Sequence, residues 1–243
     1  MSSIYLVLGA AGGIGSCLCR KLSAQGDRLA LAGRDSDRLR DLARSLDASA
    51  HPLDATSCEQ VEEAVKSVVM EHGRIDGIVN CVGSILLKPS HRTSSEEWRS
   101  VLATNLDSAF SAVKAGTSAM LKTGGSIVLL SSAAARIGLP NHDAIAAAKA
   151  GVVGLALSAA ASYAARGIRV NVVSPGLVRT PLSEPLTQNP ASEKASVAMH
   201  ALQRLGEPED VARAIAWFLD PLQSWVTGQV LGVDGGLGSV RSR

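Results

Sequence analysis

The stretch IYLVLGAAGGIG, residues 4–15, joins a run of five apolar residues to a cluster of four glycines, and a helical pattern follows it. A short apolar run before a turn signal is typical of a buried strand. Glycine lets the backbone turn tightly and approach a pyrophosphate closely, and the N-terminus of the next helix offers free N–H groups. The alternative is a plain tight turn. Because the cluster lies between the first strand and the first helix, it indicates a phosphate-binding turn.

The alternation of strand and helix continues along the chain. Short apolar runs are separated by longer segments with helical periodicity. The expected strands are Ile4–Leu8, Arg28–Ala32, Ala50–Leu53, Ile75–Asn80, Ser126–Ser131, Ile168–Ser174 and Gln229–Val233. This spacing predicts an α/β protein: a single-domain Rossmann fold over residues 1–243, with a doubly wound parallel sheet of about seven strands and helices on both faces.

Three helices have recognisable start signals. Thr56 with Glu59 and Ser94 with Glu97 form expected capping boxes, and Pro208 occupies a first-turn position that proline tolerates. The apolar faces of these helices are expected to be Val61-Val65-Val68-Val69, Leu102-Leu106-Phe110-Val113 and Val211-Ile215-Phe218.

The region Thr180–Pro208 is irregular, with Pro181, Pro185 and Pro190 among polar residues. Long insertions near the carboxyl ends of strands often close over a ligand. We therefore predict a substrate-binding loop or lid at residues 180–208 within the single domain. The alternative is a surface loop with no gating role.

The composition favours a globular domain that binds a small molecule. Of the 243 residues, 46% are hydrophobic and 19% charged, and the net charge is +2, so neither a nucleic acid nor a membrane is expected as a partner. The Ala-rich stretch Ala144–Ala165 contains Lys149, and its pattern predicts a buried or interface helix. The four cysteines form no disulfide or metal-ligand pattern, which predicts a cytoplasmic location and no metal.

The end of the second strand, LAGRD at residues 31–35, bears on the choice of cofactor. A carboxylate commonly binds the free ribose 2′-hydroxyl of NAD at this place. Here Arg34 can pair with a 2′-phosphate, although Asp35 competes as a ribose acceptor and Arg34 could also be a solvated surface charge. We predict NADP(H) in preference to NAD(H).

Further motifs make the chain resemble the short-chain dehydrogenase/reductase family over nearly its whole length. Two motifs depart in part, because Leu8 replaces the usual Thr and NCVG at residues 80–83 replaces Asn-Asn-Ala-Gly. The matching positions are Gly9, Gly13, Ile14, Gly15, Asp54, Asn80, Gly83, Asn105, Ser131, Ser132 and Lys149, with the segments Pro175–Thr180, Arg204–Gly206, Glu209–Ala212, Thr227–Gln229 and Val233–Gly236.

The resemblance implies an oxidoreductase and assigns roles to residues. It implies that Asp54 holds the adenine, that Lys149 holds the ribose, and that the Pro175–Thr180 segment holds the nicotinamide amide. It also implies a homo-oligomer, a tetramer or a dimer. The expected cofactor-binding residues are Gly9, Gly13, Ile14, Gly15, Arg34, Asp54, Asn80, Gly83, Lys149, Pro175, Gly176, Val178 and Thr180.

One departure concerns the chemistry. The family motif Tyr-x-x-x-Lys places its Tyr thirteen residues after the catalytic Ser, and that position is Ile145, four residues before Lys149. Tyr163 is about 27 Å further along the expected helix and cannot substitute. The remaining candidate catalytic residues are Ser132, Lys149, Asn105 and His142. Loss of general acid catalysis typically lowers the rate by about 10²–10⁴-fold.

Three hypotheses follow for a chain without this tyrosine. The first is an NADP(H)-dependent reductase of an activated C=C bond in a small or acyl-type substrate, where Ser132, Asn105 and Lys149 stabilise the enolate. The second is a carbonyl reductase or alcohol dehydrogenase in which His142, beside Asp143, replaces the acid. The third is a non-catalytic NADP(H)-binding scaffold protein. Substrate identity is not encoded in any motif.

Overall fold

The computed structural model describes residues 2–240 and contains one seven-stranded parallel sheet in the order β3-β2-β1-β4-β5-β6-β7. The strands are β1 (Ile4–Leu8), β2 (Arg28–Gly33), β3 (Ser49–Pro52), β4 (Gly77–Asn80), β5 (Gly125–Leu130), β6 (Ile168–Pro175) and β7 (Val230–Val233). All seven lie where the sequence predicts strands: β1 matches at both ends, and the ends of the others differ by at most two residues. The central strands β1, β4 and β6 are buried along their whole length, as a parallel sheet covered on both faces requires.

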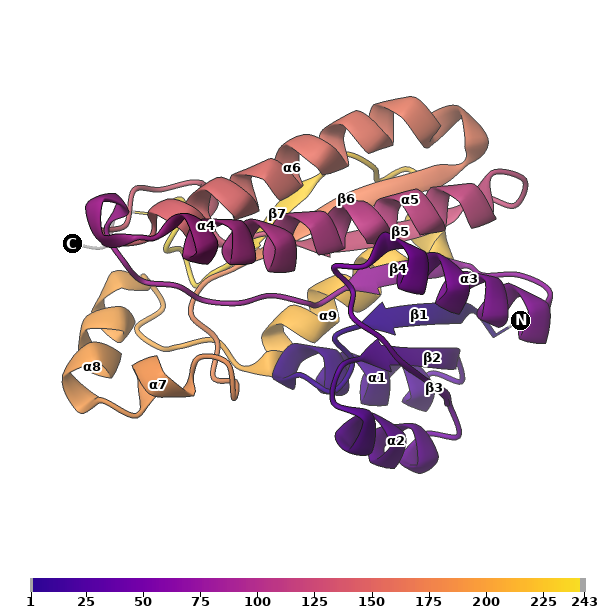
Figure 1. Ribbon diagram of the computed structural model, residues 1–243, viewed down its shortest axis with the longest axis horizontal. Coiled ribbons are helices and arrows are strands. Elements are labelled where there is room, and N and C mark those ends of the chain that lie inside the picture. Colours follow the sequence, from indigo (N-terminus) through magenta and orange to yellow (C-terminus); the bar gives the residue numbers. More distant parts are fainter. Residues whose placement is uncertain (1, 241–243) are drawn as a thin grey trace.

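Helices cover both faces of the sheet, and the doubly wound Rossmann prediction is confirmed (Figure 1). The α-helices are α1 (Gly13–Ala24), α2 (Ser36–Ser45), α3 (Cys58–His72), α4 (Ser95–Leu102), α5 (Ser108–Met120), α6 (Asp143–Tyr163), α7 (Glu184–Thr187), α8 (Pro190–Met199) and α9 (Pro208–Leu219). Apolar residues of α3, α5 and α6 form the core on one face, and those of α1, α2 and α9 form the core on the other.

The expected faces of α3 and α9 are confirmed. Val61, Val65 and Val68 are buried in α3, and the stripe of Val211, Ile215 and Phe218 is buried in α9. The capping box of Ser94 and Glu97 is present at the start of α4. The expected cap of α3 is wrong, because Ser57 and not Thr56 is the N-cap.

Phe110 also differs from expectation, since 51% of it is exposed. The chain between α4 and α5 forms a π-helical segment, η2 (Ala103–Asp107), which replaces the continuous helix that the pattern predicts. A π turn inserts a residue into the helical repeat and rotates the side chains that follow. Val113 still packs into the core, whereas Phe110 faces outward.

The region Thr180–Pro208 is more regular than its composition indicates, because it contains α7 and α8. Pro190 is in the first turn of α8, where Asn189 caps the helix by accepting hydrogen bonds from the backbone of Ala191 and Ser192. Figure 1 shows α7 and α8 outside the three layers of the sheet and its helices.

The long helix α6 lies along the sheet beside β6. By length and composition the segment Asp143–Arg166 could cross a membrane, but 44% of its apolar window is buried inside the protein. The part that packs against the sheet agrees with the prediction of a buried or interface helix, and the rest of the helix faces outward.

Candidate active site

The turn between β1 and α1 uses glycine where a side chain would not fit. Gly9 has a φ of +74°, in the left-handed region, and a Cβ on Gly15 would lie 2.2 Å from the carbonyl oxygen of Gly9. The helix α1 follows Gly12, which supplies no side-chain cap. The first N–H groups of α1 are therefore free to bind a phosphate group.

A groove of about 480 Å³ extends from this turn across the carboxyl ends of β2, β3 and β4. Its walls combine the uncapped end of α1 with small backbone positions and two arginines, Arg34 and Arg38, which fits a phosphorylated dinucleotide. The predicted cofactor-binding residues that line this groove are Gly9, Gly13, Ile14, Gly15, Arg34, Asp54, Gly83 and Thr180.

Of the two charged residues that follow β2, Arg34 is better placed than Asp35 to bind a group at the ribose 2′ position, because Asp35 is engaged in a helix cap. The Asp35 carboxylate caps α2 by accepting a hydrogen bond from the Arg38 backbone N–H at 3.1 Å, and it lies 3.9 Å from Arg38 Nε. Within residues 2–240, Arg34 has no carboxylate within 4 Å. Sequence analysis missed Arg38, which also lines the groove.

Asp54 lies in the groove with its carboxylate already oriented. Its Oδ1 accepts hydrogen bonds from the backbone N–H and the hydroxyl of Thr56, at 3.0 and 2.9 Å. The backbone hydrogen bond from Thr56 is the main reason that the pKa of Asp54 is below its usual value, and Arg34 lowers it further. Asp54 is therefore an ionised acceptor on the groove wall.

Asn80 and Val178 are buried and do not line the groove. Asn80 is buried, its Oδ1 accepts a hydrogen bond from Val82 N, and its Nδ2 donates to Ser108 Oγ, which fixes the turn after β4. Val178 is buried, and its carbonyl accepts a hydrogen bond from the Ser183 hydroxyl.

Pro175 and Gly176 lie at the carboxyl end of β6. Pro175 pairs with Val233 of β7, and Gly176 lines a second cavity of about 450 Å³. None of these four residues, Asn80, Pro175, Gly176 and Val178, lines the 480 Å³ groove, so their cofactor contacts stay predictions.

Lys149 is buried on α6 beneath the end of β5. Its Nζ donates a hydrogen bond to the Leu130 carbonyl at 2.9 Å, and its own carbonyl accepts one from Ser131 Oγ at 2.8 Å. Among residues 2–240 no carboxylate lies within 4 Å of the Lys149 ammonium. Burial without a counter-ion lowers the pKa of Lys149 to about 8, and the Cys81 thiol opposes this effect.

Ser132 and Asn105 lie on the segments that surround Lys149. Ser132 is half-buried two residues after the end of β5, and its Oγ accepts a hydrogen bond from Ala134 N at 3.1 Å. Asn105 is fully buried in η2, and its side chain bonds to Ser84 and to the Val101 carbonyl. A π-helical turn often marks a functional position.

His142 is the N-cap residue of α6. His142 is half-buried, and its Nδ1 donates to the Pro140 carbonyl at 2.8 Å, so its neutral form has no N–H left on Nε2. Asp143 accepts a hydrogen bond from Ser90 and forms no ion pair with His142. The role of His142 as an acid stays a prediction.

Ile145 lies in a small apolar cluster and is 5% exposed. It is one helical turn before Lys149, the spacing that the resemblance assigns to the missing tyrosine. The cluster consists of Val101, Ala144, Ile145 and Ala148, with Leu86 and Leu102 packed against it.

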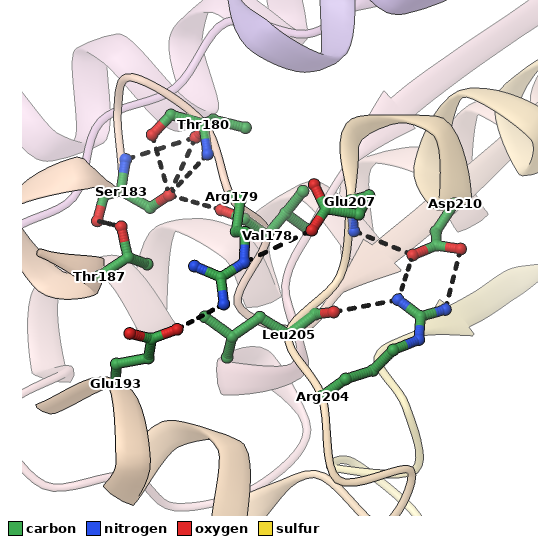
Figure 2. Close-up of polar contacts among 10 residues, drawn as sticks. All are labelled: Val178, Arg179, Thr180, Ser183, Thr187, Glu193, Arg204, Leu205, Glu207 and Asp210. Atoms are coloured by element: carbon green, nitrogen blue, oxygen red, sulfur yellow. Dashed lines mark hydrogen bonds and ion pairs between the residues drawn. The ribbon is translucent and has the colours of Figure 1, made fainter. Parts of the chain in front are cut away.

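The α7–α8 segment is attached to the groove by a polar network (Figure 2). Arg179 forms ion pairs with Glu193 of α8 and with Glu207, the latter at 3.4 Å. The Ser183 hydroxyl accepts a hydrogen bond from Thr180 N at 3.0 Å. A Cβ on Gly13 would lie 2.8 Å from Thr180 Cγ2, so Thr180 packs directly over the glycine turn.

His200 is a second attachment that sequence analysis did not single out. It is buried at the end of α8, its Nδ1 donates to the Ser196 carbonyl at 2.7 Å, and its Nε2 accepts from Leu177 N at 3.2 Å. A lone histidine in a polar stretch carries no sequence signal for this role. Together with the Arg179 ion pairs, it holds the segment against the carboxyl end of β6.

Comparisons with known proteins agree with this geometry. Residues 9–238 match the model of the family described as "Enoyl-(Acyl carrier protein) reductase". The chain is 35% identical over 240 residues to the 3-oxoacyl-[acyl-carrier-protein] reductase FabG of Thermotoga maritima, covering 96% of this chain and 97% of that protein.

Two solved structures share the fold. A short-chain type dehydrogenase/reductase from Mycobacterium ulcerans has a TM-score of 0.94 and 32% identity, covering 100% of this chain and 93% of that one. A variant of the actinorhodin polyketide ketoreductase with NADPH has a TM-score of 0.93 and 30% identity, covering 98% of each chain.

The lowered pKa of Lys149 predicts a pH-dependent stability. Between pH 8 and the unfolded value of about 10.5, the unfolded chain binds more protons than the folded one, so stability rises with pH in this window. Below pH 8 the buried charge should reduce the free energy of unfolding by roughly 3 kcal/mol. Lys149→Met should therefore be more stable than the wild type in urea unfolding at pH 7, and this gain should shrink towards pH 10.5.

The exposed Lys122 provides the matched control, because Lys122→Met removes a lysine charge from the surface. Its effect on the free energy of unfolding should be small at both pH values. A difference between Lys149→Met and wild type that stays constant from pH 7 to pH 10.5 would contradict the assignment.

Proposed function

Since this chain belongs to the short-chain dehydrogenase/reductase family of NAD(P)-dependent oxidoreductases, we propose that it uses NADP(H) to reduce an activated C=C bond of a small or acyl-type substrate. The observation that carries this proposal is the apolar cluster around Ile145, one turn from Lys149. An acid that protonates a ketone oxygen is missing at this position, whereas hydrogen-bond donors that stabilise an enolate remain.

The cofactor would occupy the groove along the carboxyl ends of the strands. The free N–H groups of α1 would bind its pyrophosphate, Arg34 its 2′-phosphate and Asp54 its adenine, and Lys149 would hold its nicotinamide ribose. A bound nicotinamide cofactor supplies hydride. NADPH in the related polyketide ketoreductase structure supports the choice of NADP(H).

The remaining residues would stabilise charge. When hydride adds to the β-carbon of an α,β-unsaturated carbonyl compound, the alkene electron pair forms a new double bond between the α-carbon and the carbonyl carbon, and the carbonyl π pair moves to the oxygen, which gives an enolate. The Ser132 hydroxyl can donate a hydrogen bond to this oxygen, because its Oγ accepts from Ala134 N and its proton is free. A proton from solvent then completes the reduction at the α-carbon.

The names of the relatives support an acyl-type substrate. The matching family is described as "Enoyl-(Acyl carrier protein) reductase", and one relative is named a 3-oxoacyl-[acyl-carrier-protein] reductase. We infer an enoyl thioester or a related enone as the substrate. The ketoreductase names also keep the carbonyl reductase hypothesis open, with His142 as the acid.

We further propose that the protein is a cytoplasmic homotetramer or homodimer. Small residues cover the outer face of α6: Ala147, Ala150 and Gly154 are exposed, next to the exposed Leu157. Gly151 instead packs inside the subunit, where a Cβ would lie 2.9 Å from Leu106. An exposed face of small residues permits close packing of a second helix, and four free cysteines agree with a reducing compartment.

The oligomer proposal predicts that sedimentation equilibrium will give a mass two or four times the monomer mass of 25.1 kDa. Gly154→Arg should shift the protein towards monomer, because a long charged side chain on this face prevents close packing. A wild-type protein that sediments as a monomer would overturn the proposal.

Arg34 predicts the cofactor preference. A charged hydrogen bond contributes about 1.5–3 kcal/mol, so NADPH should bind roughly 10–150-fold more tightly than NADH. In calorimetric titrations Arg34→Ala should remove most of this preference and leave NADH affinity unchanged. Arg40→Ala is the control, since Arg40 pairs with Asp37 outside the groove. Equal affinities of the wild type for both cofactors would contradict the assignment.

Ile145 separates the C=C and C=O hypotheses. Ile145→Tyr places a phenol one turn from Lys149 and should raise ketone reduction by about 10²-fold or more, with little gain on enones. Ile145→Phe is the matched control, because it adds the same ring without the hydroxyl. NADPH oxidation with a panel of ketones, enones and enoyl thioesters measures both effects.

The same panel gives the contrary results. If Ile145→Tyr reduces ketones no faster than Ile145→Phe, the phenol position is assigned wrongly. If wild type reduces ketones and His142→Ala lowers turnover by about 10²-fold, His142 is the acid. If wild type binds NADPH and reduces nothing in the panel, the scaffold hypothesis replaces the enzyme hypothesis.

A further inference from the structure

The hydrogen bonds of Asn105 leave its side chain nothing to donate to a substrate. A primary amide has two hydrogens, and one of those on Asn105 Nδ2 goes to Ser84 Oγ at 2.9 Å while the other goes to the Val101 carbonyl at 2.9 Å. Its Oδ1 accepts a hydrogen bond from Ser84 N at 3.1 Å. Asn105 is thus bound on both ends of its amide, and its orientation is fixed because the Val101 carbonyl can only accept a hydrogen bond and Ser84 N can only donate one.

Ser84 is the residue that these bonds hold in place. Both its backbone N–H and its hydroxyl oxygen are paired with the same amide, so its Oγ acts as an acceptor, and among residues 2–240 no acceptor binds its hydroxyl proton. The side chain is half-buried, in contrast to the fully buried Asn105. The accessible donor in this pair is therefore the hydroxyl of Ser84.

The same arrangement occurs at Ser132. Its Oγ accepts a hydrogen bond from a backbone N–H, that of Ala134 at 3.1 Å, and its proton is likewise free. Ser84 follows β4 and Ser132 follows β5, and these strands are parallel neighbours in the register Asn80 to Leu129. Both hydroxyls thus emerge at adjacent carboxyl ends of the sheet, the edge at which ligands bind in such folds.

Lys149 connects the two segments. Its Nζ donates to the carbonyl of Leu130, two residues before Ser132, and lies 3.6 Å from the position that a Cβ on Gly83 would take. Asn105 Oδ1 is 3.2 Å from the same position, and Gly83 itself lines the cofactor groove. Ser84 therefore follows directly on a groove residue that lies beside the buried ammonium.

We propose that Ser84 donates a hydrogen bond to the reacting oxygen of the substrate, so that Ser84 and Ser132 form a two-hydroxyl site for the enolate. Asn105 is a positioning residue for Ser84 in this arrangement. The proposal rests on the proposed reductase function and deepens it. It also explains how the site can work without a tyrosine hydroxyl at position 145. Two oriented hydroxyl donors stabilise a developing oxyanion, although neither is acidic enough to serve as a general acid.

The experiment measures steady-state reduction of crotonyl-coenzyme A with NADPH, together with the NADPH dissociation constant, for wild type, Ser84→Ala and Ser84→Thr. Removal of one oxyanion donor typically lowers kcat by about 10²–10³-fold. Ser84→Ala should lose about 10²-fold in kcat with its NADPH affinity unchanged. Ser84→Thr keeps the hydroxyl and should stay within about tenfold of wild type. Ser90→Ala, on the same loop, should match wild type.

A structural role for Ser84 gives a different result, because disordering Asn105 and Gly83 would weaken NADPH binding and lower the melting temperature without a selective loss of kcat. That pattern would overturn the proposal, as would a Ser84→Ala variant with wild-type kcat. If Ser84→Ala does not fold, Ser84→Cys takes its place, since a thiol has a similar size and is a weak donor. Wild type that binds NADPH but reduces neither crotonyl-coenzyme A nor the ketones and enones of the panel would overturn the proposed function and this inference together.

Discussion

The close approach of Gly15 to the Gly9 carbonyl is the constraint on which the rest of the site depends. A Cβ on Gly15 would lie 2.2 Å from that oxygen, so only glycine lets α1 begin this near to the end of β1. The consequence is a helix N-terminus with free N–H groups at the edge of the sheet. The ends of β2, β3 and β4 open onto the same edge, which is why Arg34, Asp54 and Gly83 share one groove.

The hydrogen bonds inside the site determine which of its groups can still donate to a ligand. Lys149 is buried beside a carbonyl and has no carboxylate partner among residues 2–240, so its charge destabilises the fold. Asn105 has both amide hydrogens engaged, which makes it a support. The serine hydroxyls at positions 84 and 132 still have a proton to offer. These hydrogen bonds are the basis for proposing that the site stabilises negative charge on oxygen.

The α7–α8 segment combines firm attachment with a peripheral position. Arg179 pairs with Glu193 and Glu207, but these side chains are partly exposed, so each ion pair contributes little. The buried His200, hydrogen-bonded at both ring nitrogens, is the stronger attachment. Because Thr180 packs over Gly13, movement of the segment would open the glycine turn. The role of residues 180–208 as a substrate-binding loop or lid stays a prediction.

Local pattern in the sequence determined the sheet, the glycine turn and the place of Arg34, because apolar periodicity and glycine geometry act between neighbouring residues. Family resemblance located Lys149 and Ile145. The Asp35 cap of α2 is also a local contact, to a backbone N–H three residues further on. Only the tertiary structure decided that Phe110 lies at the surface and that His200 lies buried against Leu177. The pairing of Ser84 with Asn105 joins residues 21 positions apart, and no periodic pattern encodes it, since such bonds depend on where separate strands and helices meet.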